Sequence, residues 1–404
     1  MKKRLLGTTA ALLAALAAGS AHAAFSDGKI KIGVLNDQSS LYADLSGQGS
    51  VLAARMAVED FGGSVNGTPV EIIFADHQNK ADIGSNIARQ WYDVEQVDAI
   101  ADVPNSAVAL AVSQITRDKN KVHLNSGAGT SSLTGDKCSP NTVHWTYDTW
   151  ALANGTGSAV VENGGDSWFF LTADYAFGHA LEGDTAAVVK EKGGQVLGEV
   201  RHPLNTADFS SFLLQAQGSG AKVIGLANAG SDTTNAIKQA SEFGIVQAGQ
   251  TLAGLLVFIT DVHGLGLQTA QGLTLTEAFY WDLNDETRAW SKRFAEQNGG
   301  KQPTMVQAGV YGAVLHYLKA LAETGDDSDG VKVVEQMKAM PTEDPLFGKG
   351  EVRVDGRTTH PMYLLQVKSP EESKGPWDYY NVVSTIPADQ AFRPLDKGGC
   401  ELVK

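Results

Sequence analysis

The sequence is poor in cysteine. Its 404 residues include only Cys138 and Cys400, and no Cys-x-x-Cys or His-x-x-x-His spacing accompanies them. Zinc sites depend on such closely spaced ligands, so we expect no metal site on these cysteines. An isolated pair in an oxidising compartment is generally bonded. We therefore predict a disulfide between Cys138 and Cys400, with two free thiols as the alternative.

Positive charge is scarce as well. The chain has 32 Lys and Arg residues against 46 Asp and Glu residues, for a formal net charge of -14. Nucleic acids and anionic membrane surfaces attract basic proteins. This balance argues against both as partners.

Long hydrophobic runs are missing from the chain after its N-terminal segment. No run there approaches the ~18 apolar residues that a membrane span needs. The N-terminus itself has the order of a secretory signal. Cations at 2–4 precede an apolar stretch at 5–18 and the small-x-small motif Ala21-His22-Ala23. We expect residues 1–23 to be cleaved on export to the periplasm. No cysteine follows the apolar stretch, so we expect neither a lipid anchor nor membrane insertion.

Catalytic motifs are also missing. The sequence has no Gly-x-Ser-x-Gly elbow, and its turn Gly127-Ala128-Gly129-Thr130-Ser131-Ser132 lacks the lysine of a P-loop. Gly47 and Gly49 follow the first predicted strand only after about ten residues, whereas a dinucleotide-binding turn starts at the strand end. We therefore expect a protein that is not an enzyme and needs no cofactor.

What the chain does contain is an alternation of short apolar runs with longer amphipathic ones, which is typical of βαβ units. Strands are predicted at 29–36, 69–75, 97–103 and 121–125, and again after Trp150 at 167–172, 195–200, 222–227 and 252–258. Helices between such strands make the sheets parallel. The sequence thus predicts an α/β protein with two doubly wound parallel-sheet lobes. Ligands of open α/β sheets bind beyond the carboxyl ends of the strands, so we expect the site in a cleft between the lobes.

Several motifs resemble those of the periplasmic substrate-binding proteins of ABC importers, in the type I group that includes the Leu/Ile/Val-binding proteins and an aromatic-acid-binding branch. The motifs are Lys31-Ile32-Gly33-Val34-Leu35, Ser39-Ser40-Leu41-Tyr42, Leu124-Asn125-Ser126-Gly127-Ala128, Asp174-Tyr175-Ala176-Phe177-Gly178 and Ala207-Asp208-Phe209-Ser210. Their order and spacing extend over most of the chain.

The resemblance implies two lobes joined by a three-strand hinge that close on a small solute. Lobe 1 would comprise 25–145 plus 276–350, and lobe 2 would comprise 146–275 plus 351–404. It also implies a membrane permease as partner. We expect a monomer.

Family members hold a ligand carboxylate with groups that follow the third and fourth strands. The matching positions are Asn105, Ser106, Ser126, Ala128 and Thr130. Helix N-termini offer unpaired N–H groups and a positive dipole end, so an anion can be bound there without a buried arginine. Ser106 could equally be an ordinary helix cap.

Aromatic side chains are expected to close on the body of the ligand from both lobes. The candidates are Tyr42, Tyr175, Phe177, Phe258 and Tyr280, with Asn228 beside them after a second-lobe strand. For any single aromatic residue, packing in the core is the alternative.

One departure from the family bears on the ligand. Where amino-acid binders present an acidic residue, this chain has Leu255-Leu256-Val257-Phe258. An ammonium group without a carboxylate in a dry cleft would cost several kcal/mol, unless Asp261 or Glu277 reaches in. We therefore hypothesise a small organic carboxylate with an aromatic or branched aliphatic body. A branched-chain amino acid is the alternative, and a soluble sensor that serves a membrane receptor is the alternative in function.

Overall fold

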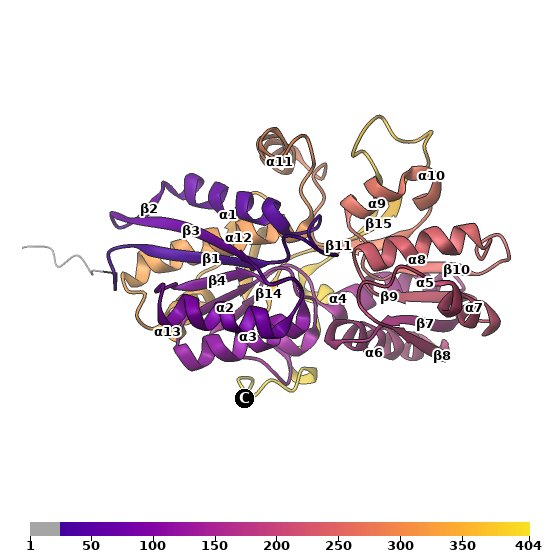
Figure 1. Cartoon of the computed structure of the whole chain (residues 1–404), viewed down its shortest axis with the longest axis horizontal. Helices are drawn as coiled ribbons and strands as arrows, with labels where there is room; N and C mark the ends of the chain where they lie inside the picture. The colour runs from indigo at the N-terminus through magenta and orange to yellow at the C-terminus, as the bar shows by residue number, and fades with distance from the viewer. Residues whose placement is uncertain (1–24) are drawn as a thin grey trace, which may run out of the picture.

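The structure is a computed structural model that describes residues 25–404. The predicted signal segment, residues 1–23, lies outside the described residues. Two lobes lie side by side along the long axis of the molecule (Figure 1). Within residues 25–404, no helix combines the length and the apolar character of a membrane span.

The first lobe is built on a six-stranded sheet of order β2-β3-β1-β4-β5-β6. All neighbours are parallel except the β2–β3 hairpin. The strands are β1 (Ile30–Asn36), β2 (Ser64–Val65), β3 (Thr68–Asp76), β4 (Ala99–Asp102), β5 (Val122–Asn125) and β6 (Thr142–His144). β4 and β5 are buried along their whole length, as expected for central parallel strands covered by helices on both faces.

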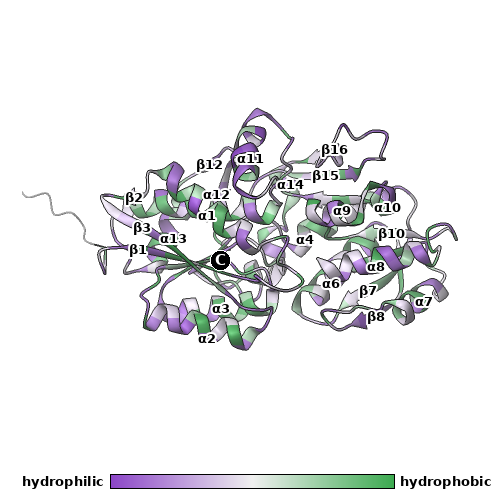
Figure 2. Ribbon diagram, turned by 45° about the horizontal axis from the view of Figure 1, so that its top comes forward, coloured by the Kyte–Doolittle hydropathy of each residue, from purple (hydrophilic) through white to green (hydrophobic). Residues whose placement is uncertain are grey.

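The helices of this lobe are α1 (Gly47–Phe61), α2 (Ala81–Asp93), α3 (Ser106–Lys119), α11 (Asp285–Gln297), α12 (Met305–Thr324) and α13 (Gly330–Ala339). α12 is buried along most of its length and packs against α1. A Cβ on Gly49 of α1 would lie 2.2 Å from the Gln307 side chain of α12, so the glycine permits this close approach. The surface helix α11 is largely hydrophilic (Figure 2).

The second lobe has a four-stranded parallel sheet of order β10-β9-β7-β8. Its strands are β7 (Ser167–Ala173), β8 (Gln195–His202), β9 (Val223–Ala227) and β10 (Thr251–Gly254). Its helical segments are α4 (Thr149–Leu152), the π-helix η2 (Ala153–Gly157), α5 (Ser158–Glu162), α6 (Ala176–Glu191), α7 (Ser210–Gly218), α8 (Ser231–Glu242), α9 (Ile259–Leu265) and α10 (Leu267–Ala270). The predicted two-lobe α/β fold is confirmed.

The strand predicted over 252–258 is shorter than expected, because β10 ends at Gly254. The next four residues, 255–258, are buried without belonging to the sheet. They form a turn into α9 at the edge of the lobe. Their apolar character comes from burial at this edge and not from a strand.

Two small antiparallel sheets complete the fold. One consists of β11 (Thr274–Glu277), β15 (Met362–Val367) and β16 (Tyr380–Ile386), and the other of β12 (Thr342–Asp344), β13 (Gly348–Val352) and β14 (Thr358–Thr359). β12 and β13 contact α12 and α13 of the first lobe. The boundary predicted at residue 350 therefore falls inside β13. The lobe limits themselves, 25–145 plus 276–350 and 146–275 plus 351–404, stay a prediction.

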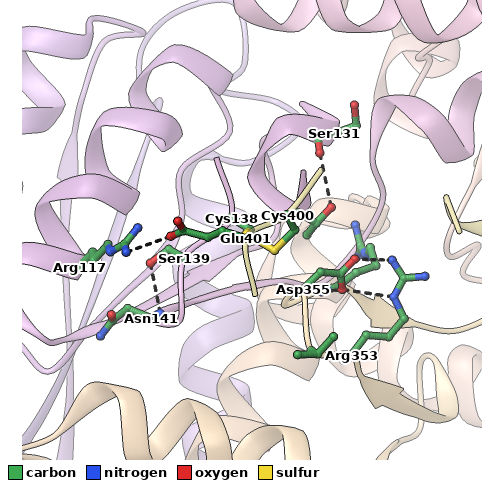
Figure 3. The surroundings of a disulfide bond; sticks show 12 residues. Arg117, Ser131, Cys138, Ser139, Asn141, Arg353, Asp355, Cys400 and Glu401 are labelled. Atoms are coloured by element: carbon green, nitrogen blue, oxygen red, sulfur yellow. Dashed lines mark hydrogen bonds and ion pairs between the residues drawn. A yellow bond between two sulfur atoms is a disulfide. The ribbon is translucent and has the colours of Figure 1, made fainter. Parts of the chain in front are cut away.

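The predicted disulfide is present between Cys138 and Cys400 (Figure 3). Both cysteines are buried, and 262 positions separate them in the sequence. A cross-link over so long a loop disfavours the unfolded chain. It also ties the C-terminus to the segment that follows β5.

A buried ion pair lies where the chain passes between the lobes. Arg357 is fully buried, and its Nη1 lies 3.5 Å from Oδ2 of Asp148. The guanidinium also donates from Nε to the Thr358 carbonyl at 2.9 Å and lies 4.5 Å from the centre of the Phe392 ring. Burial lowers the pKa of Arg357 to about 10, so the charge persists at neutral pH.

This pair generates a stability prediction. Asp148→Asn keeps an oxygen for the Ala151 N–H that Asp148 caps at 2.8 Å but leaves Arg357 without its carboxylate. Removing one partner of a buried pair costs about 3 kcal/mol, and we expect that loss in urea unfolding at pH 7. The control is Glu162→Gln at the exposed Glu162–Lys192 pair, where the change should stay within about 0.5 kcal/mol. Equal losses in both variants would contradict the role of the buried pair.

Candidate functional site

A narrow cavity, in which a water-sized molecule has about 10 Å³ of space, lies between the lobes at the carboxyl ends of their parallel strands. Its first-lobe walls follow β1, β4, β5 and β6, and its second-lobe walls follow β7, β9 and β10. The lining residues are Tyr42, Leu45, Pro104, Gly127, Tyr147, Tyr175, Phe177, Ala229, Leu256 and Phe258. Five of them are aromatic and none carries a charge.

Two tyrosine hydroxyls join the lobes at this cavity. The Tyr42 and Tyr175 hydroxyl oxygens are 2.5 Å apart. Tyr42 is held by its backbone N–H, which donates to the Asp37 carboxylate at 2.8 Å. Burial raises the pKa of both phenols well above the ordinary value. Both side chains therefore remain neutral hydroxyls at physiological pH.

The glycine turn after β5 lies against aromatic rings of both walls. A Cβ on Gly129 would lie 2.9 Å from ring carbons of Phe177 and of Tyr147. The Tyr147 hydroxyl donates to the Gly127 carbonyl at 2.6 Å, and its ring meets Phe258 edge-on at 6.3 Å. Only glycine at 129 lets these rings approach the backbone so closely.

The predicted carboxylate-binding residues lie directly behind this turn. The Asn105 side chain caps α3, because Oδ1 accepts from the N–H groups of Ala107 at 3.0 Å and Val108 at 3.2 Å. Ser106 Oγ accepts from the Thr130 N–H at 3.2 Å. Ser106 thus supports the turn rather than capping the helix, and Thr130 begins the 3-10 helix η1 (Ser131–Thr134).

Four buried side-chain atoms here make no hydrogen bond among residues 25–404. Two are donors, the Asn105 amide nitrogen and the Ser126 hydroxyl, and two are acceptors, Oδ1 of Asp102 and Oδ1 of Asn125. The Ser126 hydroxyl lies near enough to the Asp102 carboxyl to lower its pKa. Ala128 is buried too, and its carbonyl accepts from the Asn125 side chain at 2.8 Å. Buried polar groups are normally satisfied. Unpaired donors beside a cavity are therefore available to a bound molecule.

The structure brings together four of the predicted residues in the cavity lining: Tyr42, Tyr175, Phe177 and Phe258. Asn228 lies elsewhere, since its Oδ1 accepts from the Thr233 hydroxyl at 2.7 Å and its Nδ2 meets His202 Nε2 at 3.1 Å. Tyr280 is outside the lining as well. Its ring packs 5.1 Å from that of Tyr380, and its hydroxyl donates to the Trp377 carbonyl at 3.4 Å.

Several lining residues were not among the predicted site residues: Leu45, Pro104, Gly127, Tyr147, Ala229 and Leu256. Pro104 and Ala229 adjoin the predicted Asn105 and Asn228. The position of Tyr147, an aromatic residue just past the end of β6, was a usable signal, because sites gather at the carboxyl ends of parallel strands.

The acids considered as partners for an ammonium group do not line the cavity. Asp261 accepts from the Phe258 backbone N–H at 2.9 Å, and Glu277 accepts from the Tyr380 hydroxyl at 3.1 Å. Burial raises the pKa of Asp261 to about 7 and that of Glu277 well above its ordinary value. With this pKa the Asp261 carboxyl is still partly ionised at neutral pH.

A buried aspartate, Asp102, lies against the glycine turn that follows β5. Asp102 Oδ2 accepts from Asn36 Nδ2 at 3.0 Å and from the Ser46 hydroxyl at 2.9 Å. Its backbone and that of Val103 are left-handed, with φ of 78° and 54°, which costs about 1–3 kcal/mol each for residues other than glycine. This strained bend at the end of β4 brings Pro104 to the cavity.

Comparison with known proteins agrees with this geometry. A model of the periplasmic binding protein family matches residues 29–376. The chain belongs to this family. A solved periplasmic binding protein from Burkholderia mallei is 54% identical with a TM-score of 0.91, and the match covers 94% of this chain and 100% of that one. The resemblance to the substrate-binding proteins of ABC importers is thereby confirmed.

Other relatives differ in the ligand that their names state. A branched chain amino acid ABC transporter periplasmic ligand-binding protein from Burkholderia xenovorans is 40% identical, with a TM-score of 0.83 and coverage of 93% and 100%. A Leu/Ile/Val-binding protein homolog 6 from Brucella melitensis is 26% identical over 94% of this chain and 96% of its own length. A solute binding protein from R. palustris in complex with benzoate shares the fold at 19% identity, with a TM-score of 0.81 and coverage of 92% and 99%.

The buried Asp102 carboxyl predicts how the stability of this family member depends on pH. Burial raises the pKa of its carboxyl from 3.8 to about 6, against hydrogen bonds that lower it. A carboxyl whose pKa is raised in the folded state stabilises the fold at low pH, and the wild type loses this stabilisation as the pH rises through the folded-state pKa. A variant without the carboxyl does not lose stability in this way.

We expect the free energy of unfolding of Asp102→Asn, relative to the wild type, to increase by about 2 kcal/mol between about pH 4.5 and about pH 7.5. Urea unfolding at the two pH values measures it. Asp136→Asn, at an exposed position, is the control and should show no such trend. A pH-independent difference for Asp102→Asn would contradict the buried carboxyl as its source.

Proposed function

We propose that this family member is the periplasmic solute-binding component of an ABC importer, and that it captures a small organic carboxylate, an aromatic acid or a related branched acid. The lobes close on the solute, which is then delivered to a membrane permease without chemical turnover. The observation that carries this proposal is the cavity lining, with five aromatic side chains and no charge.

The lining favours an uncharged ligand body. No carboxylate is among the lining residues, and Asp261 and Glu277 accept hydrogen bonds elsewhere. An ammonium group enclosed there without a partner would cost several kcal/mol. An aromatic ring instead gains from edge and face contacts with Tyr147, Phe177 and Phe258.

The acid end has a matching environment behind the glycine turn. The unpaired Asn105 amide and Ser126 hydroxyl lie next to the lining residues Pro104 and Gly127. α3 begins at Ser106, so its N-terminal dipole favours a negative charge there. We assign the carboxylate to this side, supported by Ser106, Ala128 and Thr130. Asn228 and Tyr280 lie outside the lining and support the site without touching the ligand.

Closure is supported by contacts that link the lobes. The hydroxyls of Tyr42 and Tyr175 meet across the cavity, and a Cβ on Gly230 would lie 2.4 Å from the Leu41 carbonyl oxygen. A ligand that touches both walls favours the closed form by its differential affinity for that form. Export through residues 1–23 and a monomeric state belong to the same proposal.

Calorimetric titration tests the ligand class. We expect benzoate, 4-hydroxybenzoate, hydroxycinnamates or branched 2-oxo acids to bind and leucine not to bind. Phe177→Ala removes one wall and should weaken binding of the tightest acid by about tenfold or more, or about 1.4 kcal/mol. Phe243→Ala, at a 44% exposed position of the second lobe, is the matched control and should bind as the wild type does. Tight leucine binding with no response to any acid would refute the proposed ligand in favour of the branched-chain amino acid alternative.

A further inference from the structure

The C-terminal residues, which the predicted limits place in lobe 2, run from β16 to the first lobe (Figure 1). We call residues 387–404, which follow β16, the C-terminal strap. The strap contains α14 (Ala388–Ala391) and the 3-10 helix η3 (Leu395–Lys397). Near its start, the Gln390 carbonyl accepts from the Asn154 side chain of η2 at 2.8 Å. At its end, Cys400 is bonded to Cys138 of the first lobe (Figure 3).

Between these two ends, the strap packs on residues 353–360, which precede β15. The Arg353 guanidinium donates to the Arg393 carbonyl at 3.0 Å. The Phe392 ring is buried between the Arg357 guanidinium, 4.5 Å away, and the His360 ring, 5.3 Å away. The strap is thus part of the region where the chain passes between the lobes.

The strap also reaches a contact between the two lobes. The Arg393 guanidinium donates to the Ser131 carbonyl at 2.9 Å. The Ser131 hydroxyl in turn donates to the Asp184 carboxylate of α6 at 2.9 Å, and the Thr149 hydroxyl donates to the same oxygen at 2.6 Å. The strap, the glycine turn of the first lobe and α6 of the second lobe are therefore joined at one point. Ser131 is two residues from Gly129, on which Phe177 packs.

We propose that the C-terminal strap is a fourth connection between the lobes, fastened by the Cys138–Cys400 disulfide, and that it limits how far the cleft opens. This inference rests on the proposed hinge closure. Opening separates α6 from the turn at 127–131, while the strap runs from the second-lobe strand β16 to the first lobe next to that turn. Without the disulfide, the far end of the strap would keep the exposed Arg117–Glu401 ion pair at 3.0 Å, and exposed pairs contribute little.

Small-angle X-ray scattering of the ligand-free protein tests the strap. The Cys138→Ser/Cys400→Ser double variant releases it without leaving a free thiol. We expect its radius of gyration to exceed that of the wild type by about 1 Å, on the ~21 Å of a compact chain of this length. Arg117→Ala removes the exposed ion pair but keeps the disulfide, and it should match the wild type.

A second variant keeps the test decisive if the double variant does not fold. Arg393→Ala retains the disulfide but removes the contact with Ser131, and we expect a smaller increase of the same sign. An unchanged radius of gyration in a folded double variant that has lost only thermal stability would overturn the proposal, because the disulfide would then act on the unfolded chain alone. The comparison uses no ligand. Tight leucine binding with no response to any acid would therefore refute the proposed ligand and leave this result intact.

Discussion

The close approach of aromatic rings to the backbone of Gly129 is the constraint on which the site depends. Phe177 comes from the second lobe and Tyr147 from the end of the first-lobe sheet, and both rings would be 2.9 Å from a Cβ at this position. Any side chain there would hold the two walls apart. The same turn carries the unpaired hydroxyl of Ser126, so one short segment sets both the fit of the rings and the placement of polar groups.

The lining has no charged residue, because the nearby acidic side chains accept hydrogen bonds from groups outside the cavity. Asp261 accepts a hydrogen bond from the Phe258 backbone N–H at the start of α9. Glu277 accepts one from the Tyr380 hydroxyl in the small antiparallel sheet. Asp102 lies under the turn with donors from Asn36 and Ser46. Burial raises the pKa of all three carboxyls. None of the three carboxyls is among the lining residues, so the walls of the cavity themselves are uncharged.

Much of this could be predicted from the sequence, because hydrophobic periodicity specifies parallel strands and their carboxyl ends gather the site. The positions of Tyr42, Tyr175, Phe177 and Phe258 in the lining follow from that rule together with the family motifs. Side-chain direction does not follow from it. Asn228 follows β9 as expected, but its side chain accepts a hydrogen bond from Thr233 and does not reach the cavity. The return of the tail to the first lobe has no periodic signal, and only the predicted Cys138–Cys400 disulfide indicates it. The path of the tail depends on single contacts, such as that of Arg393 with Ser131, which the sequence does not show.

The tyrosine pair shows how these features combine. Burial keeps both hydroxyls neutral by raising their pKa values, so Tyr42 and Tyr175 together have two O–H donors. Their mutual hydrogen bond uses one donor, and the second remains free for an acceptor. Because each lobe contributes one hydroxyl, that free donor is held in place only when the lobes meet. A solute with an acceptor at this end therefore gains a contact that the separated lobes cannot offer, and differential affinity of this kind is what favours closure.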